Sequence, residues 1–129
     1  MTQKRGLILF AHGARDPRWA EPFEAVARSV REREPQRVVQ LAFLEFMAPS
    51  LLDAGSALAR AGCTFVDVVP LFLGAGGHVR KDLPGLLSEL AAQYPQVSWQ
   101  LRTAIGEVPS VIDAMAAAAL ALTAGEAPA

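Results

Sequence analysis

Two histidines and a glutamate stand where this chain could carry out chemistry. Each follows an apolar run: Leu7–Ala11 before His12, Val38–Leu44 before Glu45, and Phe65–Phe72 before His78. The chain has no other histidine. Imidazole nitrogens and a carboxylate oxygen together suit a divalent first-row metal, and three protein ligands leave coordination positions open. The same groups could instead act as general bases near neutral pH.

The apolar runs predict strands that are buried on both faces, because their hydrophobic residues are nearly continuous rather than alternating. The four predicted strands are Leu7–Ala11, Val38–Leu44, Phe65–Phe72 and Val97–Leu101. Apolar residues at helical spacing predict helices at Pro17–Arg33, Ser50–Ala61, Leu83–Ala92 and Val108–Leu122. This alternating order predicts an α/β fold: a single open four-stranded parallel sheet with helices on both faces.

The predicted fold indicates where the three polar residues lie. In open α/β sheets, ligands bind beyond the carboxyl ends of the strands, where loops lead into helices. His12, Glu45 and His78 are all expected in that layer. Glycines in the same loops let the backbone approach a ligand closely, and Gly76 and Gly77 are expected to line the substrate site.

Both histidine loops also carry a helix-start signal. An aspartate four residues after each histidine is followed closely by proline, which is typical of a capped helix start. The two signals are Asp16 with Pro17 and Asp82 with Pro84. Each loop is therefore expected to carry its histidine into a cleft and then to begin a helix.

Positive charge gathers beside the histidines, although the chain as a whole has a net charge of −1. That balance gives no basic field for nucleic acid or for an anionic membrane, so neither is expected as a partner. Four cations nevertheless flank the predicted cleft, namely Arg15, Arg18, Arg80 and Lys81. Together with helix N-termini they favour an anionic ligand such as a polycarboxylate.

Size and composition are those of one globular domain. The 129 residues are 52% hydrophobic, and we expect one domain over residues 1–122 followed by a disordered tail at 123–129. The single cysteine, Cys63, cannot form an intrachain disulfide and is expected in the core. No secretory leader is recognised, and the apolar segment Ala114–Ala124 is far shorter than the roughly 20 residues that cross a bilayer. These features predict a soluble cytoplasmic protein.

Three longer motifs lie in order along the chain: "HGARDP" from His12, "FLEFMAPSL" from Phe43 and "VVPLFLGAGGHVRKDLP" from Val68. Together they resemble the CbiX family of sirohydrochlorin chelatases, which are class II tetrapyrrole metallochelatases. The resemblance spans about Leu7 to Ile112. Family members often have serine where this chain has Ala14, a position that holds none of the expected ligands.

The resemblance implies insertion of Co²⁺ or Fe²⁺ into sirohydrochlorin, an octacarboxylate macrocycle, on a path to cobalamin or sirohaem. It implies that His12 and His78 are the catalytic and metal-binding pair, and that Glu45 is a third ligand or a proton acceptor. The metal is then a substrate, and no organic cofactor is implied.

The resemblance also implies a homodimer, because the longer relatives contain two such lobes around one cleft. We expect the contact between the two copies to use apolar residues that do not pack against the sheet. The candidate surfaces are Phe46 with Met47, Leu71–Leu73, and the alanine-rich helix at Ala114–Ala121. The first two are favoured since they border the site.

Other functions remain open from the residues alone. A metal or tetrapyrrole carrier would use the same ligands without turnover. Histidine phosphatases also have a strand-end His-Gly pair, but they carry an arginine immediately before the histidine, where this chain has Ala11. No G-x-x-x-x-G-K-[ST] motif indicates ATP. The sequence does not choose the metal, although the lack of a histidine-rich stretch disfavours nickel.

Overall fold

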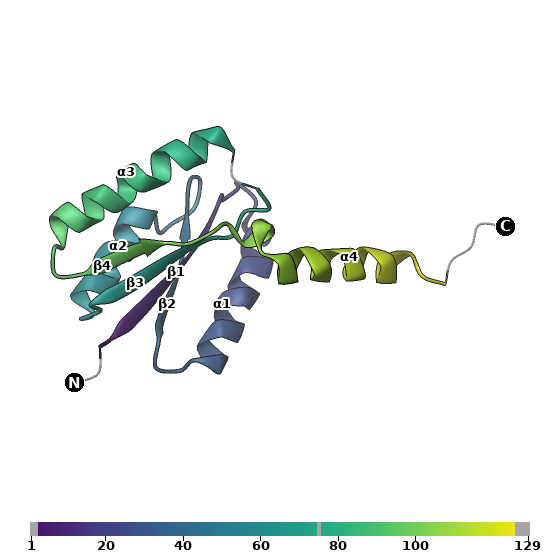
Figure 1. Ribbon diagram of the computed structural model, residues 1–129, viewed down its shortest axis with the longest axis horizontal. Helices are drawn as coiled ribbons and strands as arrows, with labels where there is room; N and C mark the ends of the chain where they lie inside the picture. Colours follow the sequence, from purple (N-terminus) through teal and green to yellow (C-terminus); the bar gives the residue numbers. More distant parts are fainter. Residues whose placement is uncertain (1–2, 75, 126–129) are drawn as a thin grey trace.

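The computed structural model describes residues 3–74 and 76–125, except for the side chains of residues 77–80. Four parallel strands form one sheet in the order β2-β1-β3-β4 (Figure 1). The strands are β1 (Arg5–Ala11), β2 (Val38–Phe43), β3 (Phe65–Pro70) and β4 (Ser98–Leu101). The predicted α/β class and parallel sheet are confirmed, and every strand boundary lies within two residues of its predicted position.

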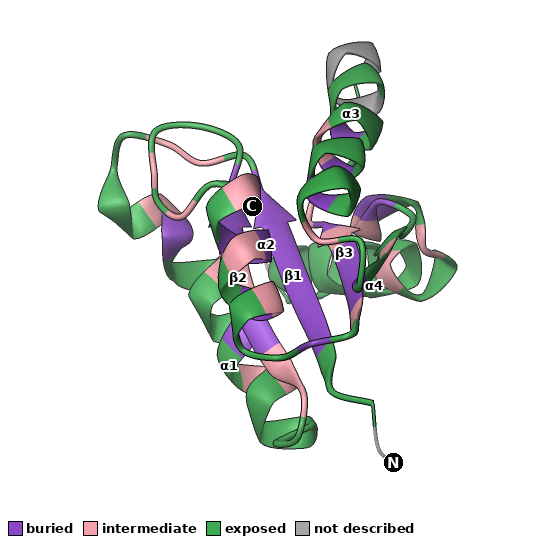
Figure 2. Cartoon of the chain, turned by 90° about the vertical axis from the view of Figure 1, so that its left-hand side faces the viewer, coloured by how far each residue is buried: buried purple, intermediate pink, exposed green. Residues whose placement is uncertain are grey.

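Helices cover both faces of the sheet, as predicted. They are α1 (Glu21–Arg33), α2 (Leu51–Arg60), α3 (Gly77–Gln93) and α4 (Pro109–Thr123). On one face, Ala27 of α1 packs against Leu7 of β1. On the other face, α2 and α3 close the larger part of the core, where Leu90 and Val68 are fully buried. Figure 2 shows the buried strand β1 at the centre of this arrangement.

Cys63 belongs to this core, as predicted. It is 2% exposed, and burial raises the pKa of its thiol. The side chain therefore acts as a small apolar residue at the entrance to β3.

The first predicted helix is divided into two pieces. A 3-10 turn, η1 (Pro17–Ala20), precedes α1, and Asp16 caps it by accepting a hydrogen bond from the backbone N–H of Arg18 at 3.0 Å. Proline occupies the first turn of α1 as well, at Pro22. A proline there has no N–H to continue the preceding turn but is tolerated where a helix begins. The chain therefore restarts its helix at Glu21.

The prediction for the third helix start was wrong. Helix α3 begins at Gly77, with Gly76 as its N-cap, so His78 lies in the first helical turn rather than in a loop. Asp82 and Pro84 lie inside the helix and do not begin it. The burial of leucines on both sides of the proline, such as Leu83, keeps the helix continuous through a residue that lacks one backbone donor.

Helix α4 stands apart from the body of the molecule. It leaves the sheet where β4 ends and projects away from the other elements (Figure 1), and it contains no buried residue. Thr123 is helical, whereas the sequence placed it in the tail; residues 126–129 of that tail lie outside the described residues. Within residues 3–74 and 76–125, no helix combines the length and hydropathy that a membrane crossing requires.

Ser50 caps α2 directly after the loop that carries Glu45. Its hydroxyl oxygen accepts a hydrogen bond from the backbone N–H of Asp53 at 3.1 Å. Ser50→Ala should therefore lower the free energy of unfolding by about 1 kcal/mol, as measured by urea denaturation. Ser88→Ala, at an exposed position inside α3, is the control and should be nearly neutral. Equal losses in the two variants would contradict the capping role.

Candidate metal and substrate site

The candidate site lies at the carboxyl edge, the end of the sheet where the four strands finish. β1 and β3 are hydrogen-bonded neighbours in the middle of the sheet. The chain leaves β1 toward α1 on one face and leaves β3 toward α3 on the other. Two connections that diverge in this way open a crevice between them, which is the usual ligand position in open α/β sheets.

Backbone hydrogen bonds hold His12 and Glu45 side by side at this edge. The N–H of Leu44 donates to the carbonyl oxygen of Ala11 at 2.9 Å, and the N–H of Glu45 donates to that of His12 at 3.0 Å. The ladder between β1 and β2 thus continues past the strand ends. Both His12 and Glu45 are exposed. The structure therefore brings two of the three predicted ligands together on one open surface.

Gly13 gives the two loops the room for this pairing. Its φ of +89° lies in the left-handed region, and a Cβ at this position would overlap the backbone oxygen of Glu45. Phe46, directly after Glu45, also has a left-handed φ of 66°, which is rare for a large residue. Its side chain is 58% exposed. The strained turn therefore leaves an aromatic ring in solvent beside the carboxylate.

The imidazole of His12 rests on the ring of Phe72. The two ring centroids are 4.1 Å apart and the ring planes are inclined by 32°. Phe72 is 2% exposed, and its own ring packs against Phe10 of β1. The sequence identified Phe72 only as the end of a strand; the available signal was an aromatic residue in the apolar "PLFLG" stretch. The buried Phe72 ring therefore supports the His12 imidazole, a contact that sequence reasoning missed.

A backbone hydrogen bond also holds Phe72 in place. The backbone N–H of Gly106, in the 3-10 turn η2 (Ile105–Glu107), donates to the carbonyl oxygen of Phe72 at 2.9 Å. A Cβ on Gly106 would overlap the backbone of Leu73. The segment after β4 therefore packs closely against the segment after β3. A shift of the Phe72 backbone would break the hydrogen bond from Gly106.

The predicted substrate-binding cations differ in what they contact. The guanidinium of Arg15 lies 5.0 Å from the centroid of the Phe46 ring. Arg18 instead pairs with Asp16, with 2.9 Å between Nη2 and Oδ2. The hydrogen bond from Arg18 lowers the pKa of the Asp16 carboxyl, and the same pair raises the pKa of Arg18. Lys81 is exposed. Arg15 therefore lies over the ring of the residue that follows Glu45, while Arg18 is engaged by Asp16.

His78 is the predicted ligand whose side chain the structure leaves out. Its backbone lies at the start of α3, and the side chains of His78 and Arg80 fall outside the described residues. Gly76 has open space where a Cβ would stand. Among the side chains that are described, no group of three His, Cys, Asp or Glu residues gathers around a possible metal position. The three-ligand site thus stays a prediction in which the described residues supply His12 and Glu45.

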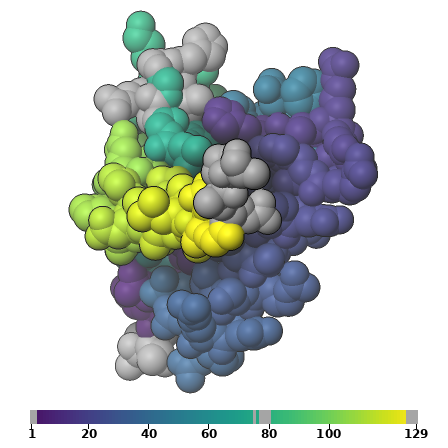
Figure 3. Space-filling model, turned by 90° about the vertical axis from the view of Figure 1, so that its right-hand side faces the viewer, coloured from purple at the N-terminus to yellow at the C-terminus, as the bar shows by residue number. Residues whose placement is uncertain are grey.

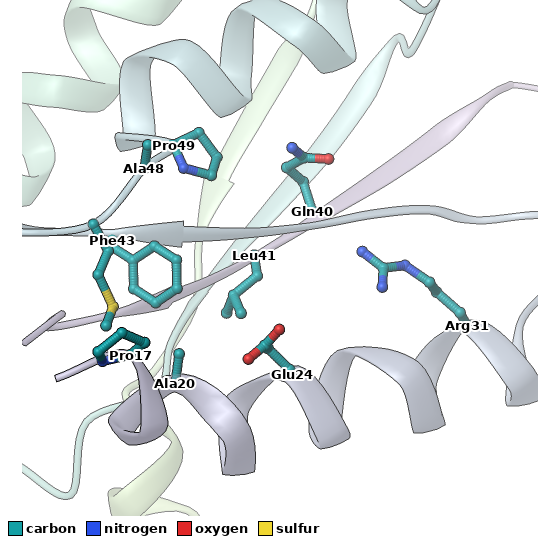
Figure 4. Close-up of a pocket in the computed structure, with 10 residues that line it drawn as sticks. Pro17, Ala20, Glu24, Arg31, Gln40, Leu41, Phe43, Ala48 and Pro49 are labelled. Carbon is teal, nitrogen blue, oxygen red and sulfur yellow. The ribbon is translucent and has the colours of Figure 1, made fainter.

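A separate pocket of about 430 Å³ runs along β2 and α1 (Figure 4). Glu24 and Arg31 reach into it from α1, and Gln40 from β2. Arg31 donates a hydrogen bond to the carbonyl oxygen of Val39 at 2.9 Å and so satisfies part of the free edge of the sheet. His12 and Glu45 do not line this pocket. The candidate site is therefore the open carboxyl edge and not this groove.

The fold and these residues can be compared with known proteins. A family model described as CbiX matches residues 6–121. The chain belongs to the CbiX family. A sirohydrochlorin cobaltochelatase of Methanosarcina acetivorans is 35% identical over 88 residues, which are 68% of this chain and 68% of that protein. A crystal structure described as a cobalamin (vitamin B12) biosynthesis CbiX protein, from Marinobacter aquaeolei, has a TM-score of 0.81 at 34% identity and covers 93% of this chain and 95% of that one.

One relative is much longer than this CbiX chain, which matches only part of its length. A chloroplastic sirohydrochlorin ferrochelatase of Arabidopsis thaliana is 28% identical over 108 residues. The match covers 84% of this chain but only 48% of the plant protein. The CbiX chain described here thus spans about half the length of that relative.

Gly13→Ala should weaken Co²⁺ binding by the CbiX chain at least tenfold, because a methyl group at this position pushes the Glu45 backbone away from His12. Thermal unfolding should also begin at a lower temperature, since the left-handed φ disfavours alanine. Isothermal titration calorimetry with the metal alone gives the affinity. Gly74→Ala is the matched control, because a Cβ there meets no atom within 4 Å. Unchanged affinity in Gly13→Ala would contradict the proposed pairing.

Phe72→Leu should reduce Co²⁺ affinity several-fold, because the His12 ring loses the surface on which it rests. Phe10→Leu is the control: Phe10 is equally buried in the same core cluster, and its packing partner is Phe72 rather than His12. Both variants should lose roughly 1 kcal/mol of folding free energy. If both weakened metal binding equally, Phe72 would be a structural residue only.

Proposed function

We propose that this CbiX chain inserts Co²⁺ or Fe²⁺ into sirohydrochlorin, in cobalamin or sirohaem biosynthesis. The observation that carries the proposal is the pairing of His12 and Glu45 beside the crevice between β1 and β3. The names of the archaeal cobaltochelatase and the plant ferrochelatase support the same reaction and both metals.

The chemistry of insertion needs groups that hold a metal loosely and that accept protons. A divalent ion enters the macrocycle as two pyrrole N–H groups lose their protons, so the products are the metallated macrocycle and two H⁺. An imidazole nitrogen and a carboxylate oxygen form a borderline ligand set that leaves coordination positions open for the incoming ring nitrogens. Once the metal has moved to the macrocycle, the same two groups can accept the released protons. In this proposal His78 is the third ligand or base.

The surroundings of the pair suit a flat macrocycle that carries carboxylates. The exposed Phe46 ring offers an apolar surface next to Glu45, and the guanidinium of Arg15 lies over it. We assign Arg15 and Lys81 to the substrate carboxylates, together with Arg80 and, after release from Asp16, Arg18. We assign the backbone at Gly76 and Gly77 to the edge of the macrocycle; Gly76 has open space where a Cβ would stand.

The proposal also includes a homodimer in the cytoplasm. The match to only 48% of the plant relative supports a second copy, because one copy supplies a single sheet whose carboxyl edge is open to solvent. Two-fold pairing of identical chains is the commonest way to complete such an enclosure. The cytoplasmic location is supported by Cys63, which is the lone cysteine and is buried as a thiol.

Anaerobic incubation of the protein with sirohydrochlorin and Co²⁺, Fe²⁺ or Ni²⁺ tests the function through the absorbance change of the macrocycle. Substrates in excess over protein should be converted over many turnovers with Co²⁺ or Fe²⁺. His12→Ala and Glu45→Gln should each slow insertion at least tenfold without changing the fold, because each removes a ligand. Glu32→Gln, at an exposed carboxylate in the last turn of α1, is the control and should keep the wild-type rate.

Conversion that stops after one equivalent per chain would identify a carrier rather than an enzyme. Full activity in His12→Ala under limiting metal would reject the assigned site.

A further inference from the structure

The turn after Glu45 holds a large residue in a strained conformation. The backbone N–H of Met47 donates to the carbonyl oxygen of Glu45 at 2.8 Å, which closes a γ-turn centred on Phe46. The φ of Phe46 is 66°, and a γ-turn with a positive φ at its centre is the rare and strained form. Glycine would adopt this φ without a steric cost. The turn itself therefore does not require a phenylalanine.

Contacts on both sides of the turn keep it in place. The N–H of Glu45 donates to the carbonyl oxygen of His12 at 3.0 Å, and Met47 packs against the buried cluster that contains Phe43. The N–H of Phe43 donates to the carbonyl oxygen of Pro49 at 2.9 Å and so closes the loop. A strained residue persists where its surroundings determine its conformation in this way, and such residues gather at functional sites.

The ring of Phe46 is not part of the core. The residue is 58% exposed, and it belongs to none of the buried clusters of the described residues. Its neighbour is Arg15, whose guanidinium carbon lies 5.0 Å from the ring centroid. Arg15 is itself exposed, and it has no carboxylate partner among the described residues. The strain at Phe46 is therefore not offset by burial of its ring.

The two side chains lie where a large ligand can reach them. Phe46 directly follows Glu45, whose backbone is bonded to that of His12. In Figure 3, α4 (yellow) stands in front, and the purple segment that includes the residues after β1 stays uncovered at the upper right. The carboxyl edge thus combines two candidate metal ligands with an aromatic ring and an exposed cation.

We propose that Phe46 is the platform on which the macrocycle stacks, and that Arg15, held over the same ring, selects macrocycles whose periphery carries carboxylates. Aromatic rings stack on one another in an offset arrangement, and a guanidinium binds a carboxylate through two parallel hydrogen bonds. The strained turn serves this role because it directs the ring into solvent instead of into the core. The inference rests on the proposed function for the identity of the macrocycle.

The two side chains have separable roles in this arrangement. Removal of the ring should weaken the binding of every tetrapyrrole, because stacking does not depend on the peripheral groups. Removal of the guanidinium should weaken the binding of carboxylate-rich tetrapyrroles above all, since a periphery with few carboxylates offers it few partners. If Phe46 acted instead by shaping the turn, its replacement would alter metal binding through Glu45.

Fluorescence titration of the full chain with metal-free porphyrins tests the platform. The probes are uroporphyrin, an octacarboxylate, and mesoporphyrin, a dicarboxylate. Phe46→Gly should raise the dissociation constant for both probes by about fivefold or more, whereas Phe46→Tyr, which keeps the ring, should stay within about twofold of the wild type. Arg15→Gln should raise it by about fivefold or more for uroporphyrin and by less than about twofold for mesoporphyrin.

Val26→Ala is the control for the loss of exposed apolar surface. Val26 is 42% exposed and lies in α1, outside the loops that carry the candidate ligands. This variant should bind both porphyrins as tightly as the wild type does.

Two further measurements separate a binding role from a structural one. The melting temperature of Phe46→Gly should lie no more than about 4 °C below that of the wild type, because release of the positive φ offsets the more flexible unfolded chain. Calorimetric titration with Co²⁺ alone should give the wild-type affinity, since glycine keeps the turn. A larger loss of stability, or weaker Co²⁺ binding, would show that Phe46 shapes the loop and would overturn the platform.

Wild-type affinity for uroporphyrin in Phe46→Gly, or no binding of uroporphyrin by the wild type, would also overturn the platform. Equal effects on the two porphyrins in Arg15→Gln, or none, would overturn the selective role of Arg15. Metal insertion is scored separately. Binding that depends on Phe46 without any insertion would overturn the chelatase assignment and leave the platform intact. Insertion by Phe46→Gly with the wild-type KM for sirohydrochlorin would overturn the platform and leave the chelatase assignment intact.

Discussion

The backbone hydrogen bond from Glu45 to His12 is the constraint on which the rest of the site depends. It exists because β1 and β2 run parallel and because their ladder continues beyond the last paired residues. Gly13 allows that continuation, since any side chain there would meet the Glu45 backbone. The link is made by the main chain, so the imidazole and the carboxylate both remain exposed to solvent. Without it, the two groups would lie on separate loops with no fixed relation.

Phe72 connects this exposed pair to the packed interior. A histidine on an open surface has many accessible orientations, and restricting them costs conformational entropy. The buried Phe72 ring offers one flat surface and is itself held by Phe10 and by the Gly106 N–H. The core thus reaches the His12 side chain through one aromatic contact. The Gly106 hydrogen bond also holds the turn that precedes α4, so Phe72 links the start of that helix to His12.

The charges around the site act locally. The chain is nearly neutral overall, and its exposed cations are screened over about 10 Å in ordinary salt. They therefore attract an anionic ligand only when it is already close to the crevice. The apolar residues at the same edge provide the larger contact area, and they are exposed because one sheet cannot cover its own carboxyl edge.

Much of this architecture is determined by the sequence alone. Nearly continuous apolar runs at four positions predict parallel strands, because this pattern is typical of strands buried on both faces. β4 is the exception in burial, since none of its residues is buried. The strand-end positions of His12 and Glu45 follow directly from those runs. The start of α3 was not predictable in the same way. Asp82 and Pro84 carry a local helix-start signal, and only the burial of leucines on both sides shows that the helix passes through them.

The tertiary structure decided the contacts between residues far apart in the chain. The ring of Phe72 under His12, and Gly106 against the backbone of Leu73, join segments after three different strands. No periodicity in the sequence predicts contacts between segments that are so far apart along the chain. The exposure of α4 is of the same kind: its apolar composition predicts a helix that is covered, and only the three-dimensional arrangement reveals that this chain by itself has no surface placed to cover it. Local patterns specify which elements form, whereas the packing of distant elements decides which of their faces stay open.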